Sequence, residues 1–216
     1  MMYTRQNPSP RYRELNALYR SMHTEGEKFL GIPPEKTFPG QSLLPQGGRI
    51  KEMILRHGAK TLLDYGAGKG VQYQPMEITV EGVGRWSSMK AFWGIDELYC
   101  YDPAYEPFNK LPDKKFDGVI STDVLEHCPE EDIPWILDEI FGYATRFVFA
   151  NVACYPAKKR LPNGENAHCT IRGPEWWHQH LLDASSRHPG IKWEVWVENI
   201  TDTPRGKERV ENRLGN

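Results

Sequence analysis

The sequence predicts one α/β domain, in which a mostly parallel sheet lies between two layers of helices. Apolar stretches of strand length alternate along the chain with stretches of helical periodicity, which is typical of parallel strands joined by helical crossovers. The predicted strands cover residues 60–63, 98–101, 116–121 and 146–152. Carboxylates follow the first three strands, and open sheets of this kind bind ligands at the carboxyl ends of their strands. The sequence therefore also predicts a binding site at that edge.

The composition is that of a globular protein with one core. The chain has 216 residues, a net charge of −2 and 39% hydrophobic residues, which is enough for one well-buried domain. No apolar stretch approaches the roughly 20 residues that span a bilayer, and the N-terminal residues lack the apolar segment of a secretory signal. The four cysteines have no C-x-x-C spacing, which favours reduced thiols. We expect a cytoplasmic protein with no membrane partner. A net charge this close to zero does not indicate the basic surface by which many proteins bind nucleic acid.

Two helices are predicted before the first strand. Apolar residues at helical spacing predict a helix over 10–27. Prolines and glycines then keep the chain irregular to about residue 46. A second helix is predicted over 48–57, where Gly58 follows as a natural helix stop.

The most informative motif follows the first strand. Residues 64–70 read D-Y-G-A-G-K-G, with glycines at alternate positions. Because glycine adopts positive φ and has no Cβ, a ligand can approach such a turn closely, and we expect the N–H groups of the turn to face that ligand. The dehydrogenase fingerprint G-x-G-x-x-G requires a glycine where this chain has Val71. The sequence has no phosphate-binding P-loop pattern either.

The connections on either side of the second strand differ in length. Residues 71–97 are more than is needed to connect the first predicted strand to the second. Trp86, Phe92 and Trp93 in this segment indicate an insertion with its own packing. Residues 103–115, in contrast, leave little room for a further strand and its helices. The sheet is therefore predicted to be trimmed at this edge.

The C-terminal half continues the alternation of helices and strands. Apolar residues at i, i+3, i+4, i+7 and i+8 predict a helix over 129–142, and its acidic first turn suits the helix dipole. A further helix is predicted over 174–185, where proline occupies a favoured first position. Alternating apolar residues predict a strand over 193–197. Residues 201–216 are polar and are expected to form a flexible tail.

Three of these features, in this order, resemble the motifs of class I S-adenosylmethionine-dependent methyltransferases. They are the D-x-G-x-G-x-G turn, the acid Asp102 that ends the second strand, and D-V-L-E-H at 123–127 after the next strand. The resemblance covers about residues 58–152 and extends weakly beyond them. Residues 155–159 and 166–168 are also similar to an uncharacterised bacterial and phage group of these enzymes, which brings no known substrate.

The resemblance implies a three-layer α/β/α Rossmann-like methyltransferase fold in a single domain, residues 1–216. Residues 1–46 would form an N-terminal helical lid, because this fold class places its substrate cover there. Residues 47–200 would form the Rossmann-like core, followed by the tail over 201–216.

The resemblance also implies S-adenosylmethionine as the cofactor. Asp102 would accept hydrogen bonds from both ribose hydroxyls, and Asp64 would help to hold the amino-acid end through water or backbone. The residues expected to bind the cofactor are Asp64, Gly66, Ala67, Gly68, Asp102, Pro103, Asp123 and Val124. Two of them have structural alternatives, Asp102 in an Asx turn with Pro103 and Asp123 as a helix cap.

Two histidines are candidates for catalysis. His127 lies just beyond one predicted strand and His168 in the loop after the next, so that either is placed to act as a general base. The alternatives are a capping or packing role for His127 and a surface position for His168. His178 and His180 face apart on a helix, and no cysteine spacing matches a zinc site. We therefore expect no metal site.

The predicted function is transfer of a methyl group from S-adenosylmethionine to an oxygen or nitrogen of a small molecule, a sugar or metabolite, by in-line displacement. Three alternatives stay open on sequence alone. They are a nicotinamide-dependent oxidoreductase, a non-catalytic S-adenosylmethionine-binding module and a nucleic-acid methyltransferase. The expected partner is a small methyl acceptor rather than a nucleic acid.

Overall fold

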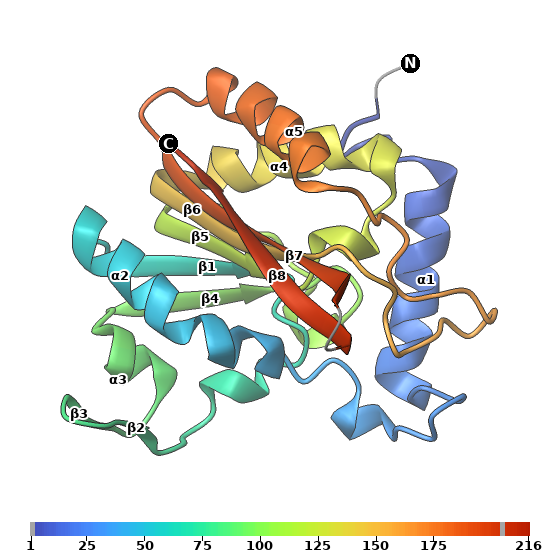
Figure 1. Cartoon of the computed structure of the whole chain (residues 1–216), viewed down its shortest axis with the longest axis horizontal. Helices are drawn as coiled ribbons and strands as arrows, with labels where there is room; N and C mark the ends of the chain where they lie inside the picture. Colours follow the sequence, from blue (N-terminus) through green and yellow to red (C-terminus); the bar gives the residue numbers. More distant parts are fainter. Residues whose placement is uncertain (1–2, 204–205) are drawn as a thin grey trace.

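The computed structural model of the protein describes residues 3–203 and 206–216, and within them six strands form one central sheet (Figure 1). In spatial order the strands are β4 (Glu97–Tyr101), β1 (Thr61–Tyr65), β5 (Phe116–Thr122), β6 (Ala144–Ala153), β7 (Lys192–Thr203) and β8 (Gly206–Gly215). The first five run parallel to their neighbours, and β8 is antiparallel to β7. The predicted α/β class with a mostly parallel sheet is confirmed.

Helices cover both faces of the sheet (Figure 1). One face carries α4 (Ile133–Tyr143) and α5 (Pro174–Arg187), and the other carries α2 (Gly47–His57) and α3 (Met89–Trp93). Each face has its own apolar cluster, because side chains of a strand alternate between the two sides. Short 3-10 helices lie at Pro34–Lys36, Gln41–Gln46, Val71–Tyr73, Glu106–Phe108, Leu125–His127 and Glu130–Asp132. The arrangement has three layers, α/β/α.

The N-terminal helix α1 (Pro10–Glu25) stands at the edge where the parallel strands end (Figure 1). Ser9 caps it, since its hydroxyl accepts a hydrogen bond from Tyr12 N at 2.9 Å. Gly26, at φ +86°, ends the helix slightly before the predicted limit. Ser9 N also donates to the buried Asp132 carboxylate at 3.0 Å. The start of α1 is thereby fastened to the residues that lead into α4.

The long connection after β1 forms its own small unit. β2 (Ile78–Val80) and β3 (Gly84–Trp86) pair as an antiparallel hairpin. The ring of Trp86 packs edge-on against Phe92 of α3, with centroids 4.9 Å apart. The predicted insertion with its own packing is confirmed. The short connection 103–115, all of which the structure describes, contains a 3-10 helix and no strand, which leaves β4 at the trimmed edge of the sheet as predicted.

The C-terminal segment differs from the expectation of a flexible tail over 201–216. Residues Gly206–Gly215 form β8, which pairs with β7 along its whole length. Nearly every residue of β8 is exposed and many are charged, a composition that suits an edge strand. Such a strand lacks the apolar alternation by which strands are predicted. The prediction of a flexible tail is therefore wrong for this segment.

Within the described residues, no helix has the length and apolar character needed to cross a membrane. All four cysteines are free thiols, as their spacing predicts. They are Cys100, Cys128, Cys154 and Cys169.

Candidate functional site

A cavity of about 600 Å³ opens at the carboxyl edge of β1, β4 and β5. Residues that follow these strands form one side of it, and α1, residues 38–42 and the loop residues 155–168 supply the other. Most of the predicted site residues line it, namely Gly66, Gly68, Asp102, Pro103, Asp123, Val124, His127 and His168. Asp64 and Ala67 are buried and lie outside the lining.

The glycine turn after β1 is closed by its own hydrogen bonds. The N–H groups of Gly66 and Ala67 both donate to the carbonyl of Tyr101, at 2.7 and 3.0 Å. The next four N–H groups donate, in order, to the Asp102 carboxylate and to the carbonyls of Phe38, Ala67 and Pro39. Every N–H from 66 to 71 is therefore used within the protein. The expectation that these groups face a ligand is wrong.

Two of the glycines are required by close contacts with the rest of the chain. At Gly66, with φ +94°, a Cβ would lie 2.3 Å from Cγ2 of Val124. At Gly68, with φ +57°, it would lie 2.4 Å from the carbonyl oxygen of Phe38. Phe38 itself has φ +49°, an uncommon value for a residue with a side chain. The turn and the segment around Phe38 thus fit together as one wall of the cavity.

Asp102 lies at the end of β4 and joins this wall. Its Oδ2 accepts a hydrogen bond from Gly68 N at 2.9 Å, and its Oδ1 accepts one from Ala104 N at 2.9 Å. The second bond forms an Asx turn across Pro103, which is the structural role that the sequence left open for Asp102. Burial raises the pKa of Asp102. A carboxylate has about four acceptor positions, which leaves about two for a ligand.

His23 of α1 lies above Asp102. Lys69 Nζ donates to His23 Nδ1 at 3.0 Å, and an ammonium group can only donate, so that the proton of the neutral ring is on Nε2. This Nε2 lies 4.0 Å from Asp102 Oδ1. Burial, with the charges of Lys69 and Lys159, lowers the pKa of His23 to about 3. Helix α1 therefore presents an uncharged imidazole to the carboxylate.

Asp64 ends up beneath the turn rather than at the cavity. Its Oδ2 accepts hydrogen bonds from Tyr73 Oη at 2.6 Å and from Gln72 Nε2 at 3.3 Å. Its Oδ1 has no hydrogen-bond partner among the described residues. Burial raises the pKa of Asp64 to about 7. Its contacts support the turn, and the structure gives it no direct path to a ligand in the cavity.

His127 and His168 meet at the cavity wall, with ring centroids 4.8 Å apart. His127 Nδ1 lies 2.8 Å from the carbonyl of Ala167, and His168 Nδ1 lies 2.6 Å from the carbonyl of Tyr155. Because a carbonyl only accepts, each Nδ1 carries a proton and each Nε2 lone pair is available. Burial and then His168 lower the pKa of His127 to about 4. His168 is only 8% exposed, so the surface alternative does not hold for it.

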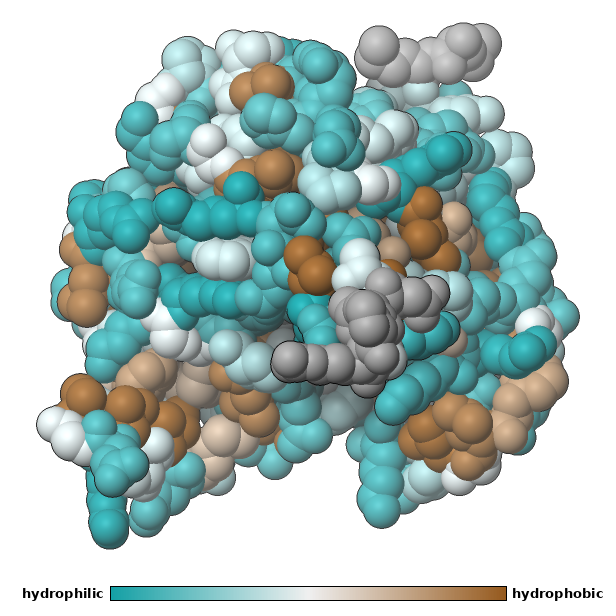
Figure 2. Space-filling view, in the orientation of Figure 1, coloured by the Kyte–Doolittle hydropathy of each residue, from teal (hydrophilic) through white to brown (hydrophobic). Residues whose placement is uncertain are grey.

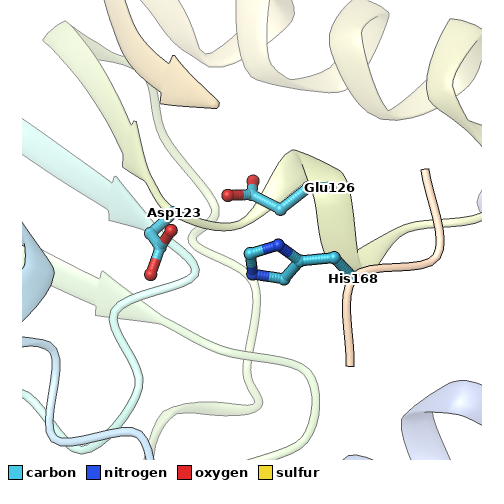
Figure 3. Close-up of side chains that lie close together, drawn as sticks. All are labelled: Asp123, Glu126 and His168. Carbon is cyan, nitrogen blue, oxygen red and sulfur yellow. The ribbon is translucent and has the colours of Figure 1, made fainter. Parts of the chain in front are cut away.

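Asp123 and Glu126 form an acidic pair beside His168 (Figure 3). Asp123 has φ +60°, and the 3-10 helix after it has no side-chain cap, so that the helix-cap alternative is not met. Glu126 is completely buried, and its Oε1 accepts a hydrogen bond from Ala153 N at 2.8 Å. Burial, followed by the charge of Asp123, raises the pKa of Glu126 well above its ordinary value.

Some residues of the site lie in segments that the sequence singles out, but no role at the site was predicted for them. Glu126 lies within the D-V-L-E-H motif, but its spacing does not reveal that the side chain turns toward His168. Tyr155 and Lys159 line the cavity from the loop after β6. Burial lowers the pKa of Lys159, whose Nζ lies 4.7 Å from the centre of the Phe38 ring.

The two helical histidines stay apart from this site. The ring of His178 lies near Trp193, whereas the ring of His180 lies near Trp176. Neither belongs to a group of candidate metal ligands among the described residues.

No protein-family model matches the chain, and no curated protein matches it either.

Proposed function

We propose that the protein is an S-adenosylmethionine-dependent methyltransferase that acts on a small molecule. The observation that carries the proposal is the position of Asp102, which ends the strand beside the glycine turn and lines the cavity. A ribose diol requires two neighbouring acceptors, and an ionised carboxylate provides strong ones. Gly66 and Gly68 line the cavity beside Asp102, and their close fit against Val124 and Phe38 holds the turn in this position.

The absence of free backbone donors in the turn favours this cofactor over a dinucleotide. A dinucleotide binds its pyrophosphate through N–H groups at the glycine turn and the following helix N-terminus. Here every N–H from 66 to 71 is bonded within the protein, and only the 3-10 helix Val71–Tyr73 follows. S-adenosylmethionine has no phosphate and does not need these donors. The nicotinamide-dependent oxidoreductase is therefore the weaker alternative.

His127 is the proposed general base for a hydroxyl acceptor. Methyl transfer is an in-line displacement at carbon, so that the main task of the protein is to align donor and acceptor. Because the ring of His127 is uncharged near pH 7, its Nε2 can take the proton that the acceptor oxygen loses as it attacks. His168 presents the same arrangement beside it and is the second candidate. A neutral amine acceptor would need no base.

The size of the cavity supports a small acceptor, such as a sugar or another metabolite. A volume of about 600 Å³ lies within the range of roughly 300–1,000 Å³ that is typical of small-ligand sites. Helix α1 covers one side of this space, which restricts the access of a polymer. The net charge of −2 provides no general basic surface for a nucleic-acid acceptor. The free thiols fit a cytoplasmic enzyme.

A ligand panel tests the proposal against its alternatives. S-adenosylmethionine and S-adenosylhomocysteine should each raise the melting temperature of the protein, whereas NAD⁺ and NADH should not. Incubation with S-adenosylmethionine and a mixture of small alcohols and amines should then release S-adenosylhomocysteine, measured by mass spectrometry. Stabilisation by NADH alone would support the oxidoreductase. Binding without any product from a broad acceptor mixture would support the non-catalytic module.

A further inference from the structure

Three side chains from two distant parts of the sequence meet at one wall of the cavity (Figure 3). Asp123 and Glu126 follow β5, and His168 lies in the loop after β6. Each offers one potential metal-ligand atom, and these atoms lie within 4.8 Å of one another. Among the described residues, this is the single group of three or more such side chains that comes so close.

Glu126 supplies the strongest sign that this group binds a ligand. Its side chain is completely buried, and Figure 3 shows the carboxylate pointing toward Asp123. Oε1 is bonded to Ala153 N, but Oε2 has no hydrogen-bond partner among the described residues. An unpaired buried carboxylate oxygen is costly. A cation bound at Oε2 would remove that cost.

The loop that carries His168 is fastened to Glu126. The N–H groups of Cys169 and Thr170 both donate to the carbonyl of Glu126, at 2.8 and 3.0 Å. His168 Nδ1 donates to the carbonyl of Tyr155, which fixes the ring and leaves Nε2 as a ligand atom. Histidines that bind metals usually donate their other N–H to such a carbonyl or carboxylate. The imidazole is thus already oriented for a metal.

We propose that Asp123, Glu126 and His168 bind one divalent transition-metal cation, Mn²⁺ or Zn²⁺, at this wall of the cavity. Carboxylates suit Mn²⁺, and a neutral imidazole suits Zn²⁺ and its neighbours in the first transition row. Mg²⁺ binds more weakly, because it prefers a shell of oxygen ligands.

The charges around the group favour a cation. Two carboxylates this close repel each other when both are ionised, and Lys159, whose charge interacts with Asp123, supplies one positive charge. Metal–ligand bonds of about 2.1 Å require ligand atoms closer than 4.8 Å, so that cation binding draws the three together. Asp123 is only partly buried and is the side chain with room to move.

The open coordination positions of the cation would face the cavity. Asp123 and His168 line the cavity, whereas Glu126 lies behind them. Cation binding is independent of methyl transfer, because it needs these three side chains alone. In a methyltransferase the cation would bind the acceptor oxygen and lower the pKa of its hydroxyl, and His127 would remain the base.

Titration of the chelator-treated, full-length protein with MnCl₂ tests the site, with free Mn²⁺ followed by its electron paramagnetic resonance signal. We expect one Mn²⁺ per chain, and spin-echo modulation from one imidazole nitrogen that disappears in His168→Gln. Asp123→Asn and Glu126→Gln should weaken binding at least ~10-fold, since even outer-shell losses reach that size. Asp102→Asn is the matched control, because it removes one carboxylate from the same cavity and should leave Mn²⁺ affinity unchanged.

Two results would overturn the site. The first is that the wild-type protein shows no saturable binding of Mn²⁺ or Zn²⁺. The second is that Asp102→Asn weakens Mn²⁺ binding as much as Asp123→Asn and Glu126→Gln do, which would show only a general attraction of cations to a negatively charged cavity. Asparagine tolerates positive φ as aspartate does, so that Asp123→Asn should fold, which circular dichroism checks. If a variant fails to fold, the spin-echo signal of the wild-type complex tests the site by itself: modulation from an imidazole nitrogen supports it, and the absence of that modulation contradicts it. S-adenosylmethionine is titrated separately, so that loss of the metal site and loss of the cofactor site are distinguishable.

Discussion

The carboxylate of Asp102 accepts a hydrogen bond from the N–H of Gly68 at 2.9 Å. This bond joins the end of β4 to the turn after β1, so that two motifs far apart in the sequence form one wall of the cavity. It also uses a backbone donor that a phosphate-bearing cofactor would need. The same contact therefore favours the proposed cofactor, which has no phosphate.

Gly68→Ala should destabilise the protein far more than a change at a glycine with free space around it. An alanine Cβ at this position would lie 2.4 Å from the Phe38 carbonyl oxygen, and positive φ adds roughly 1–2 kcal/mol. Gly31→Ala is the matched control, because Gly31 has φ +64° and nothing within 4 Å of its Cβ position. Urea unfolding should show a loss of about 1 kcal/mol for Gly31→Ala and at least about 3 kcal/mol for Gly68→Ala. Equal losses would contradict the close contact with Phe38.

Asp64→Asn should change how stability depends on pH. Asp64 ionises near pH 4 in the unfolded chain and at about 7 in the folded protein. Because the folded pKa is the higher one, the folded state binds the additional proton, and stability falls as the pH rises from 4 to 7. The penalty is absent below pH 4 and complete above pH 7, where it reaches about 4 kcal/mol at most. Urea unfolding at pH 4.5 and 7.5 should show the variant gaining stability relative to wild type, and parallel curves would contradict the buried carboxylate.

Ser9→Ala should loosen the start of α1. The substitution removes the cap of α1 and the hydroxyl bond to Asp132, a buried carboxylate. We expect the free energy of unfolding to fall by about 2 kcal/mol, with faster amide exchange in the first turn of α1. Thr24→Ala is the control, because Thr24 is exposed near the other end of the same helix. It should change stability by less than about 0.5 kcal/mol. Unchanged exchange in Ser9→Ala would count against this anchor.

His127→Ala should slow methyl transfer to a hydroxyl acceptor by about 10²–10⁴-fold, while the affinity for S-adenosylmethionine stays the same. Tyr19→Phe is a useful comparison. It removes a hydroxyl that donates to the Ala167 carbonyl at 2.7 Å and lies 3.2 Å from His127 Nδ1, but it keeps the imidazole and its own bond to that carbonyl at 2.8 Å. Radiolabelled methyl transfer should therefore fall much less in Tyr19→Phe. Equal losses in both variants would assign His127 a packing role.

Periodicity was a good guide to the elements that are apolar on at least one side. The central strands, α4 and α5 were all predictable because their buried residues recur at strand or helix spacing. β8 was not, because it is an edge strand with charged side chains on both faces. Its pairing depends on β7, which no local pattern of β8 reveals.

The site was predictable only in part, for a related reason. From the motifs, Asp102, Asp123 and His127 were correctly predicted to lie at the carboxyl ends of the strands, where they line the cavity. Two hydrogen-bond partners of the glycine turn, the carbonyls of Phe38 and Pro39, lie far from it in sequence, in a segment whose fold no local pattern predicts. The cluster around Glu126 likewise forms only when the loop after β6 folds back.

Calorimetric titration with S-adenosylmethionine, in which Asp102→Asn is compared with Asp117→Asn, is the most direct test of the cofactor. Asp117 is a matched control, because its carboxylate also accepts backbone hydrogen bonds, from Lys60 N at 2.7 Å and Thr61 N at 3.0 Å. It lies at the start of β5, away from the end of the strands where the cavity opens. Wild type and Asp117→Asn should bind alike, and Asp102→Asn at least ~10-fold more weakly, the size of one lost charge-assisted hydrogen bond. A folded wild-type protein that does not bind S-adenosylmethionine, or equal affinity in Asp102→Asn, would contradict the proposed cofactor site.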